Sequence, residues 1–155
     1  MKKVLLGAAV LAVFAAGAAQ AQAQVPAERS VKYRQGALTV MSVHVGRLGQ
    51  HAKGAITLTP AQLEQSAQVV VDMSNVAYEG FLEGTEQSKG TKAKPEIWKE
   101  WAKFKEMQVK LQGETPKLLA AAKANDIKAI QAALGGVGGS CKTCHDAYQA
   151  KDVIQ

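Results

Sequence analysis

The sequence predicts an all-α fold, an antiparallel four-helix bundle. After residue 23, apolar residues recur in steps of three and four in four separate segments, which is the period of one helix face. No segment alternates apolar and polar residues in the way that predicts a β-strand. In a bundle of this kind the four apolar stripes share one core, and cofactors lie between facing helices.

Residues 1–23 have the features of a secretory signal peptide. Two lysines precede an uncharged apolar run, and small residues follow it. Cleavage is expected after Ala21 or Ala23, because either site satisfies the small-x-small rule. The apolar run is rich in alanine and shorter than the roughly 20 residues of a spanning helix, so an uncleaved membrane anchor is the weaker alternative. We therefore expect a periplasmic mature chain, residues 24–155, without membrane insertion.

The mature chain, about 130 residues, has room for one domain with one core. Two of the 19 lysines and arginines lie in the signal segment and all 13 acids lie after it, so the mature side-chain charge is +4. The lysines are scattered, and no nucleic-acid-binding motif accompanies them. The charge therefore indicates solubility, and no nucleic-acid partner is expected.

The first helix is expected from about Glu28 to Leu48. Its apolar stripe consists of Val31, Arg34, Leu38, Met41, Val45 and Leu48. The polar stretch of residues 49–58 then ends the pattern. His44 lies off the stripe and His51 lies in that stretch, so both imidazoles are expected to be solvated.

A second helix is expected to begin after Thr59, which can act as its N-cap. Pro60 suits the first helical position, and Gln62 completes a capping box. The helix is expected to end near Gly80, before a polar loop at residues 83–94. Its inner stripe consists of Leu63, Ala67, Val70, Met73 and Ala77.

A proline opens the third helix, which is expected over residues 95–124. Its stripe consists of Ile97, Trp101, Phe104, Gln108 and Leu111. Trp98 and Trp101 cannot both be equally buried at a separation of three, and Trp101 is the better core candidate. Pro116 removes a backbone hydrogen bond and crowds the preceding turn, so a kink or break is expected near residues 112–115.

The fourth helix is expected to follow a cap at Asn125-Asp126. Its stripe consists of Ile127, Ile130, Leu134, Val137, Cys141, Cys144 and Tyr148. Four glycines between residues 135 and 139 weaken this helix. They indicate either a break before the cysteines or a bare surface that lets a flat ring or a neighbouring helix approach.

The segment Cys141-Lys142-Thr143-Cys144-His145 has the spacing of a c-type haem attachment site. Two thiols three residues apart lie about one helical turn apart, within reach of the two vinyl groups of one porphyrin. His145 can then offer an imidazole nitrogen to the iron. Because both cysteines fall in the core-facing stripe, we expect one covalently attached haem c inside the bundle.

Three other kinds of site share part of this spacing. A zinc site would need further ligands, but the chain has only two cysteines and three histidines. A thioredoxin-like dithiol belongs near a strand–helix junction, and no strand pattern precedes it. A disulfide across so short a loop would contribute little to stability.

The mature chain resembles the cytochrome c′ family over nearly its whole length. The motifs that carry the resemblance are Val31-Lys32-Tyr33-Arg34-Gln35 with Leu38 and Met41, Phe81 followed by Gly84-Thr85-Glu86, Pro95-Glu96-Ile97-Trp98, and Cys141-Lys142-Thr143-Cys144-His145-Asp146-Ala147-Tyr148. The resemblance implies a periplasmic, usually dimeric four-helix bundle. It also implies a five-coordinate haem iron whose apolar distal face binds nitric oxide and carbon monoxide.

The resemblance assigns roles to several residues. Arg34 and Gln35 are expected beside the haem propionates, although Arg34 near a helix start could instead extend to water. Leu38 is expected to cover the distal face of the iron, which disfavours dioxygen because an apolar cap donates no hydrogen bond. Tyr78 is expected either near this pocket or as a packing residue at the end of the bundle.

Met41 decides between the two main functional hypotheses. Unbound to iron, it is a core methionine, and the protein is a gas-binding haem protein rather than an enzyme. Bound to iron, it gives a six-coordinate His/Met cytochrome that transfers electrons to an unknown redox partner. A third and weaker hypothesis is a dithiol oxidoreductase that uses Cys141 and Cys144.

Two positions depart from the family pattern. Gln149 stands where many members carry a basic residue beside the proximal face, and Pro116 interrupts a helix that is usually continuous. The homodimer is implied by the resemblance alone, although Val40 and Val43, off the first stripe, would suit part of an interface.

Overall fold

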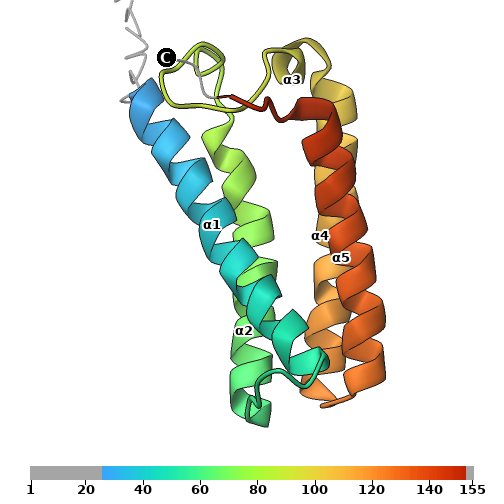
Figure 1. Cartoon of the computed structure of the whole chain (residues 1–155). Coiled ribbons are helices and arrows are strands. Elements are labelled where there is room, and N and C mark those ends of the chain that lie inside the picture. Colours follow the sequence, from blue (N-terminus) through green and yellow to red (C-terminus); the bar gives the residue numbers. More distant parts are fainter. Residues whose placement is uncertain (1–25, 153–155) are drawn as a thin grey trace, which may run out of the picture.

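The computed structural model describes residues 26–152, and over this range four long helices form the bundle that the sequence predicts. They are α1 (Ala27–Ala52), α2 (Pro60–Val76), α4 (Trp101–Lys123) and α5 (Ile127–Tyr148). Two short helices, η1 (Ala77–Gly80) and α3 (Glu96–Lys99), lie between α2 and α4. In Figure 1, α1 pairs with α2 and α4 pairs with α5, each pair antiparallel. The predicted signal peptide, residues 1–23, lies outside the described range.

The buried face of α1 follows the predicted stripe. Val31, Arg34, Met41 and Leu48 are buried, and Leu38 is half-buried against the core. The helix continues four residues beyond its expected end at Leu48.

Both histidines of α1 are half-buried, so the expectation that they are solvated is wrong. The reason at His51 is that the next segment folds back over the helix end. There the backbone N–H of Leu58 donates to Nδ1 of His51 at 3.1 Å.

The capping box at the start of α2 is confirmed. The Gln62 backbone N–H donates to Oγ1 of Thr59 at 3.3 Å, and the Thr59 backbone N–H donates to Oε1 of Gln62 at 2.9 Å. A cap of this kind contributes about 1 kcal/mol. The buried residues Leu63, Ala67 and Val70 lie on the predicted face of the helix.

The third predicted helix is two helices, because the chain leaves helical geometry at Glu100 (φ −111°, ψ 37°). The break interrupts the apolar stripe, so the prediction that Trp101 lies in the core is wrong. Trp101 is 40% exposed, whereas Trp98 is half-buried and its indole N–H donates to the carbonyl of Leu82 at 3.1 Å.

No break occurs at residues 112–115, because α4 is continuous through Pro116. Leu111, Thr115 and Leu118 are buried against the bundle, and such packing supplies most of the stability of a helix in a protein. The Thr115 hydroxyl also lies 3.1 Å from that of Ser74 on α2. These contacts hold the helical path where the proline removes one backbone bond.

Helix α5 begins at the predicted cap, where the Asp126 carboxylate accepts the backbone N–H groups of Lys128 and Ala129 at 2.9 and 3.0 Å. It continues through all four glycines, so a break before the cysteines is wrong. A Cβ added at Gly136 would collide with the Glu114 carboxylate of α4. At this one glycine, therefore, the bare surface accommodates a neighbouring helix.

The core has two parts. The main cluster fills the space between the long helices and includes Met41, Leu48, Leu63, Val70, Leu111, Leu118, Ile130 and Val137. A second, aromatic cluster is centred on Ile97, Phe104 and Tyr148. The loop of residues 81–95 crosses the end of the bundle where α1 begins and α5 ends (Figure 1). No helix within residues 26–152 has the length and apolar character to span a bilayer.

Gly80 lies directly against the backbone of α1, which generates a stability prediction. A Cβ at this position would lie 2.7 Å from Cβ of Arg34 and 2.8 Å from the carbonyl oxygen of Ser30. Because the helix backbone must shift to make room, we expect Gly80→Ala to lower the free energy of unfolding by about 1–3 kcal/mol. Denaturant titration of the haem-loaded protein measures this change.

Gly113→Ala is the matched control, since a Cβ added there meets no atom within 4 Å and the residue lies inside α4. This variant should keep or raise stability, by up to about 1 kcal/mol, because alanine favours a helix. Equal stability of the two variants would contradict the close contact between Gly80 and α1.

Candidate functional site

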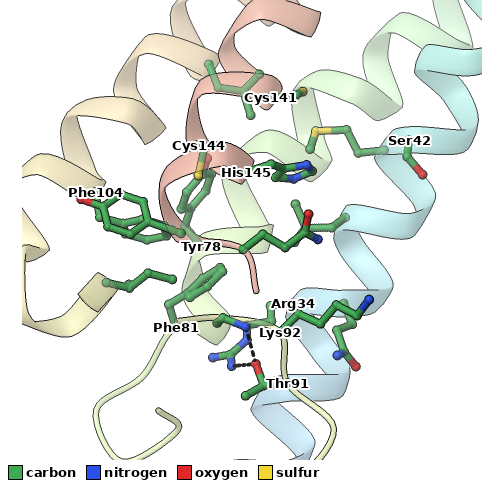
Figure 2. A pocket seen from close by; sticks show the side chains of 18 of the residues that line it. Arg34, Ser42, Tyr78, Phe81, Thr91, Lys92, Phe104, Cys141, Cys144 and His145 are labelled. Carbon is green, nitrogen blue, oxygen red and sulfur yellow. Dashed lines mark hydrogen bonds between the residues drawn. The ribbon is translucent and has the colours of Figure 1, made fainter. Parts of the chain in front are cut away.

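A cavity of about 520 Å³ lies between α1 and α5 (Figure 2). This volume falls within the range of small-molecule and cofactor sites. All the site residues that the sequence singles out line this one cavity, namely Arg34, Gln35, Leu38, Met41, Cys141, Cys144 and His145. Side chains far apart in the sequence are therefore brought together around a single space.

The two thiols lie on α5, and both are half-buried. Burial raises the pKa of Cys141, and burial together with the nearby Cys141 raises the pKa of Cys144 to about 11. Both groups are therefore neutral thiols at pH 7 and lack the thiolate character of a catalytic dithiol. This environment disfavours the oxidoreductase hypothesis.

The alternatives that remain for the cysteines find no support in residues 26–152. Both cysteines are free thiols rather than a disulfide. Within the same range, no group of three or more potential ligands could hold a metal ion in the manner of a zinc site.

His145 lies one residue after the second cysteine, on the last turns of α5. Figure 2 shows its imidazole in the space between α5 and α1. The helix end that carries His145 is hydrogen-bonded to residues outside the helix. The Lys94 N–H donates to the Tyr148 carbonyl at 2.9 Å, and the Ala150 N–H donates to the Lys92 carbonyl at 2.8 Å. The loop of residues 81–95 therefore holds the end of the helix that positions His145.

The Arg34 guanidinium is buried beside the cavity, at 2% exposure. It donates to the carbonyl of Gly80 at 2.9 Å and to the hydroxyls of Thr85 and Thr91, each at 2.8 Å. The alternative that Arg34 extends to water is therefore wrong. The side chain instead joins α1 to η1 and to the loop.

The Arg34 guanidinium also lies over two aromatic rings, 4.6 Å from the centroid of Phe81 and 5.6 Å from that of Trp98. Burial lowers the pKa of Arg34 to about 10, and the Glu86 carboxylate acts in the opposite direction. The group is therefore still charged at pH 7. Its hydrogen bonds within residues 26–152 all go to neutral oxygens, so positive charge remains at this end of the cavity.

Two further polar side chains lie at the same end. Nε2 of Gln35 donates to the carbonyl of Gly90 at 2.9 Å, and Nζ of Lys92 donates to the carbonyl of Lys151 at 2.9 Å. Both residues line the cavity and are exposed. The polar end is thus partly open to solvent and bears two cations, Arg34 and Lys92.

The rest of the cavity is mainly apolar. Leu38 and Met41 line it from α1, with Met41 5% exposed. Tyr78 packs on Phe104 with ring centroids 5.5 Å apart, and burial raises the pKa of its hydroxyl, which stays neutral. Tyr78 therefore belongs both to the cavity wall and to the packing at the bundle end.

These residues fit a haem c. Two neutral thiols one helical turn apart suit attachment to two vinyl groups, and the adjacent imidazole suits an iron ligand. The apolar walls suit the porphyrin faces, and the cationic end suits its two carboxylates.

The residues that sequence reasoning missed are those that hold Arg34. Thr85 and Thr91 are buried, at 2% and 1% exposure, yet they lie in a polar loop without periodicity. The one available signal was Arg34 itself, because a buried guanidinium requires acceptors from elsewhere in the chain. Tyr148 lies in the predicted stripe of the fourth helix and is buried, but the bond that its hydroxyl donates to Glu100 at 2.8 Å was not predicted.

Comparisons with known proteins show the family of this chain. The family model described as Cytochrome C' matches residues 29–149. Cytochrome c' of Alcaligenes xylosoxydans xylosoxydans is 44% identical over 124 residues, covering 80% of this chain and 95% of the relative. Cytochrome c' of Rubrivivax gelatinosus is 35% identical over 122 residues, covering 79% and 95%.

Among solved structures, a nitric oxide complex of a leucine-to-alanine variant of cytochrome c prime from Alcaligenes xylosoxidans superposes on this chain with a TM-score of 0.75. It is 43% identical and covers 81% of this chain and 97% of the solved chain. The family match, the sequence identity and the shared fold therefore show that the chain belongs to the cytochrome c′ family of c-type haem proteins.

Proposed function

We propose that this chain is a periplasmic gas-binding haem protein with five-coordinate iron. In this proposal Cys141 and Cys144 carry one haem c, His145 is the only protein ligand of the iron, and nitric oxide and carbon monoxide are the ligands. The haem iron supplies the vacant coordination position for the gas. The observation that carries the proposal is that Leu38 and Met41 line, from α1, the same cavity that His145 lines from α5.

The proposed role of Leu38 is to cover the vacant side of the iron. Leu38 is half-buried, lines the cavity from α1 and packs against the main core. A leucine donates no hydrogen bond, so it gives bound dioxygen no polar stabilisation and leaves nitric oxide and carbon monoxide favoured. A nitric oxide complex of a leucine-to-alanine variant of cytochrome c prime from Alcaligenes xylosoxidans supports nitric oxide as the proposed ligand.

The proposed role of Arg34 and Gln35 is to bind the haem propionates. Arg34 is a charged group whose acceptors within the described range are neutral, and it faces the cavity. An anion beside it would offset the cost of burying the positive charge. Gln35 lies at the same end, one residue further along α1.

Met41 gives the second candidate function, a six-coordinate electron-transfer cytochrome. Met41 is buried and lines the same cavity as His145, which is the observation in favour of this alternative. A thioether ligand would fill the sixth position and exclude gas. We place Met41 second because the family resemblance favours a vacant position.

The physiological proposal is protection against nitrosative stress by gas binding, with electron transfer to an unknown redox partner as a further capacity and no enzymatic turnover. We also propose export to the periplasm and a homodimer. Val40 and Val43 are 42% and 54% exposed on α1, and they would supply part of the dimer surface.

The covalent link is tested by acid-acetone extraction of the purified protein. Thioether bonds at Cys141 and Cys144 should keep the haem with the polypeptide, whereas the double variant Cys141→Ala, Cys144→Ala should release it. A globin, which holds its haem without thioether bonds, is the extraction control. Release of haem from the parent protein would contradict the attachment, and complete absence of haem would favour a dithiol protein.

The role of Leu38 is tested by the kinetics of carbon monoxide association. Truncation in Leu38→Ala should open the distal side and speed association on the order of tenfold, equivalent to about 1.4 kcal/mol of barrier. Val45→Ala is the matched control, because Val45 packs against the core from the same helix but does not line the cavity. Equal rates in parent and Leu38→Ala would remove the assigned role.

The alternative function is tested by the optical spectrum of Met41→Leu. We expect this variant to retain the high-spin spectrum of the parent, because leucine preserves the packing and no iron bond is lost. Met73→Leu on α2 is the control for a methionine that packs against the core outside the cavity. A low-spin parent that becomes high-spin only in Met41→Leu would establish the electron-transfer cytochrome instead.

A further inference from the structure

A second hollow, of about 390 Å³, shares Phe81 with the haem cavity. Its lining consists of Phe81, Glu83, Glu86, Trp98 and Trp101. Three aromatic rings and two carboxylates therefore surround one space, and no lysine or arginine of the described range lines it. We call this hollow the aromatic cage.

The rings of the aromatic cage are positioned by the loop after η1 and by the break at Glu100. The Phe81 and Trp98 ring centroids lie 6.2 Å apart, and the indole N–H of Trp98 is fixed by its bond to the Leu82 carbonyl. Because the helix restarts at Trp101, this side chain lies at the surface, 40% exposed. The exposure that made Trp101 a wrong core prediction places it in the cage.

The carboxylates give the cage a negative charge on a chain whose net charge is positive. Glu86 is partly engaged, since its Oε1 accepts the Gly84 backbone N–H at 3.1 Å and its charge acts on Arg34. Glu83 is exposed and makes no hydrogen bond or ion pair within residues 26–152. Glu83 is therefore the carboxylate available to an incoming cation.

Two of these rings already hold a cation inside the protein. The Arg34 guanidinium lies over Phe81 and Trp98, but Arg34 lines the haem cavity and not the cage. The Arg34 charge also repels a second cation at the same rings, and the carboxylates of Glu83 and Glu86 offset that repulsion on the cage side. On the cage side, Trp101 adds a further aromatic ring and Glu83 adds a carboxylate, and both are exposed at the surface.

We propose that the aromatic cage binds a small organic cation with a quaternary ammonium group, of the choline type. A quaternary ammonium has no N–H to donate and is attracted to aromatic faces, which is why such groups are recognised by cages of several rings. A primary ammonium is strongly hydrated and would gain less from the rings. The cage should therefore prefer a quaternary ammonium to a hydrated cation that only neutralises Glu83 and Glu86.

The two indole N–H signals in the NMR spectrum of the isotope-labelled, haem-loaded protein test this proposal, because the chain has only two tryptophans. Choline should shift both signals with a dissociation constant in the millimolar range. Ethanolamine, which lacks the three methyl groups, and dimethylbutanol, the neutral isostere in which carbon replaces nitrogen, should each bind about tenfold more weakly. Equal affinity for choline and either analogue would overturn the proposal, as would the absence of any shift.

Variants at the surface complete the test without touching the haem cavity. Trp101→Leu should abolish choline binding, and Glu83→Gln should weaken it several-fold. Glu106→Gln, an exposed carboxylate of α4 outside the cage, is the matched control and should leave it unchanged. If Glu83→Gln and Glu106→Gln weakened choline binding equally, the loss would come from the change in net charge, and the assigned site would be overturned.

A choline headgroup of a lipid carries the same chemistry, so the test includes phosphatidylcholine vesicles. The protein should bind free choline in solution and should not sediment with the vesicles. Sedimentation with vesicles in the absence of binding to free choline would overturn the assignment to a small molecule.

Discussion

The buried guanidinium of Arg34 is the interaction on which the haem end of the bundle depends. From α1 it donates to Gly80 of η1 and to Thr85 and Thr91 of the following loop. An unpaired charge in this position would be costly, and these charge-assisted hydrogen bonds offset that cost. The residue after Thr91 is bonded in turn to the segment that follows α5. The Arg34 side chain thus links α1, which supplies Leu38, to the loop of residues 81–95. That loop is bonded to the end of α5, which carries His145.

This linkage explains how a simple bundle can contain a polar-ended cavity. The main core closes the far end of the helices with aliphatic side chains, whereas the haem end is held by an aromatic cluster and a loop. The cavity therefore has mainly apolar walls, which would suit a flat ring, and cations at one end, which would suit the carboxylates of a haem. The same loop places Phe81 between the cavity and the aromatic cage. The Phe81 side chain therefore lines both spaces.

Periodic and local signals made most of the fold predictable. The stripe of α1, the capping box at Thr59 and the cap at Asp126 were all predicted correctly, because each depends on neighbours a few residues away. Expectations failed where tertiary packing decides the outcome. Packing against α2 keeps α4 helical through Pro116, and the break at Glu100, which has no proline or glycine signal, turns Trp101 to the surface. Within the site, the haem attachment motif was predicted from the sequence. The burial of Thr85 and Thr91 beside Arg34 was not, because a polar loop has no pattern that predicts burial.

We propose that the sixth coordination position of the iron is vacant, although Met41 lines the same cavity. The most direct test is the optical and electron paramagnetic resonance spectrum of the mature, haem-loaded protein, ferric and ferrous, with and without carbon monoxide. We predict a high-spin iron that takes up carbon monoxide in the ferrous state. A low-spin iron that is indifferent to the gas would contradict the account, because it would mean that a side chain of the protein already occupies the position.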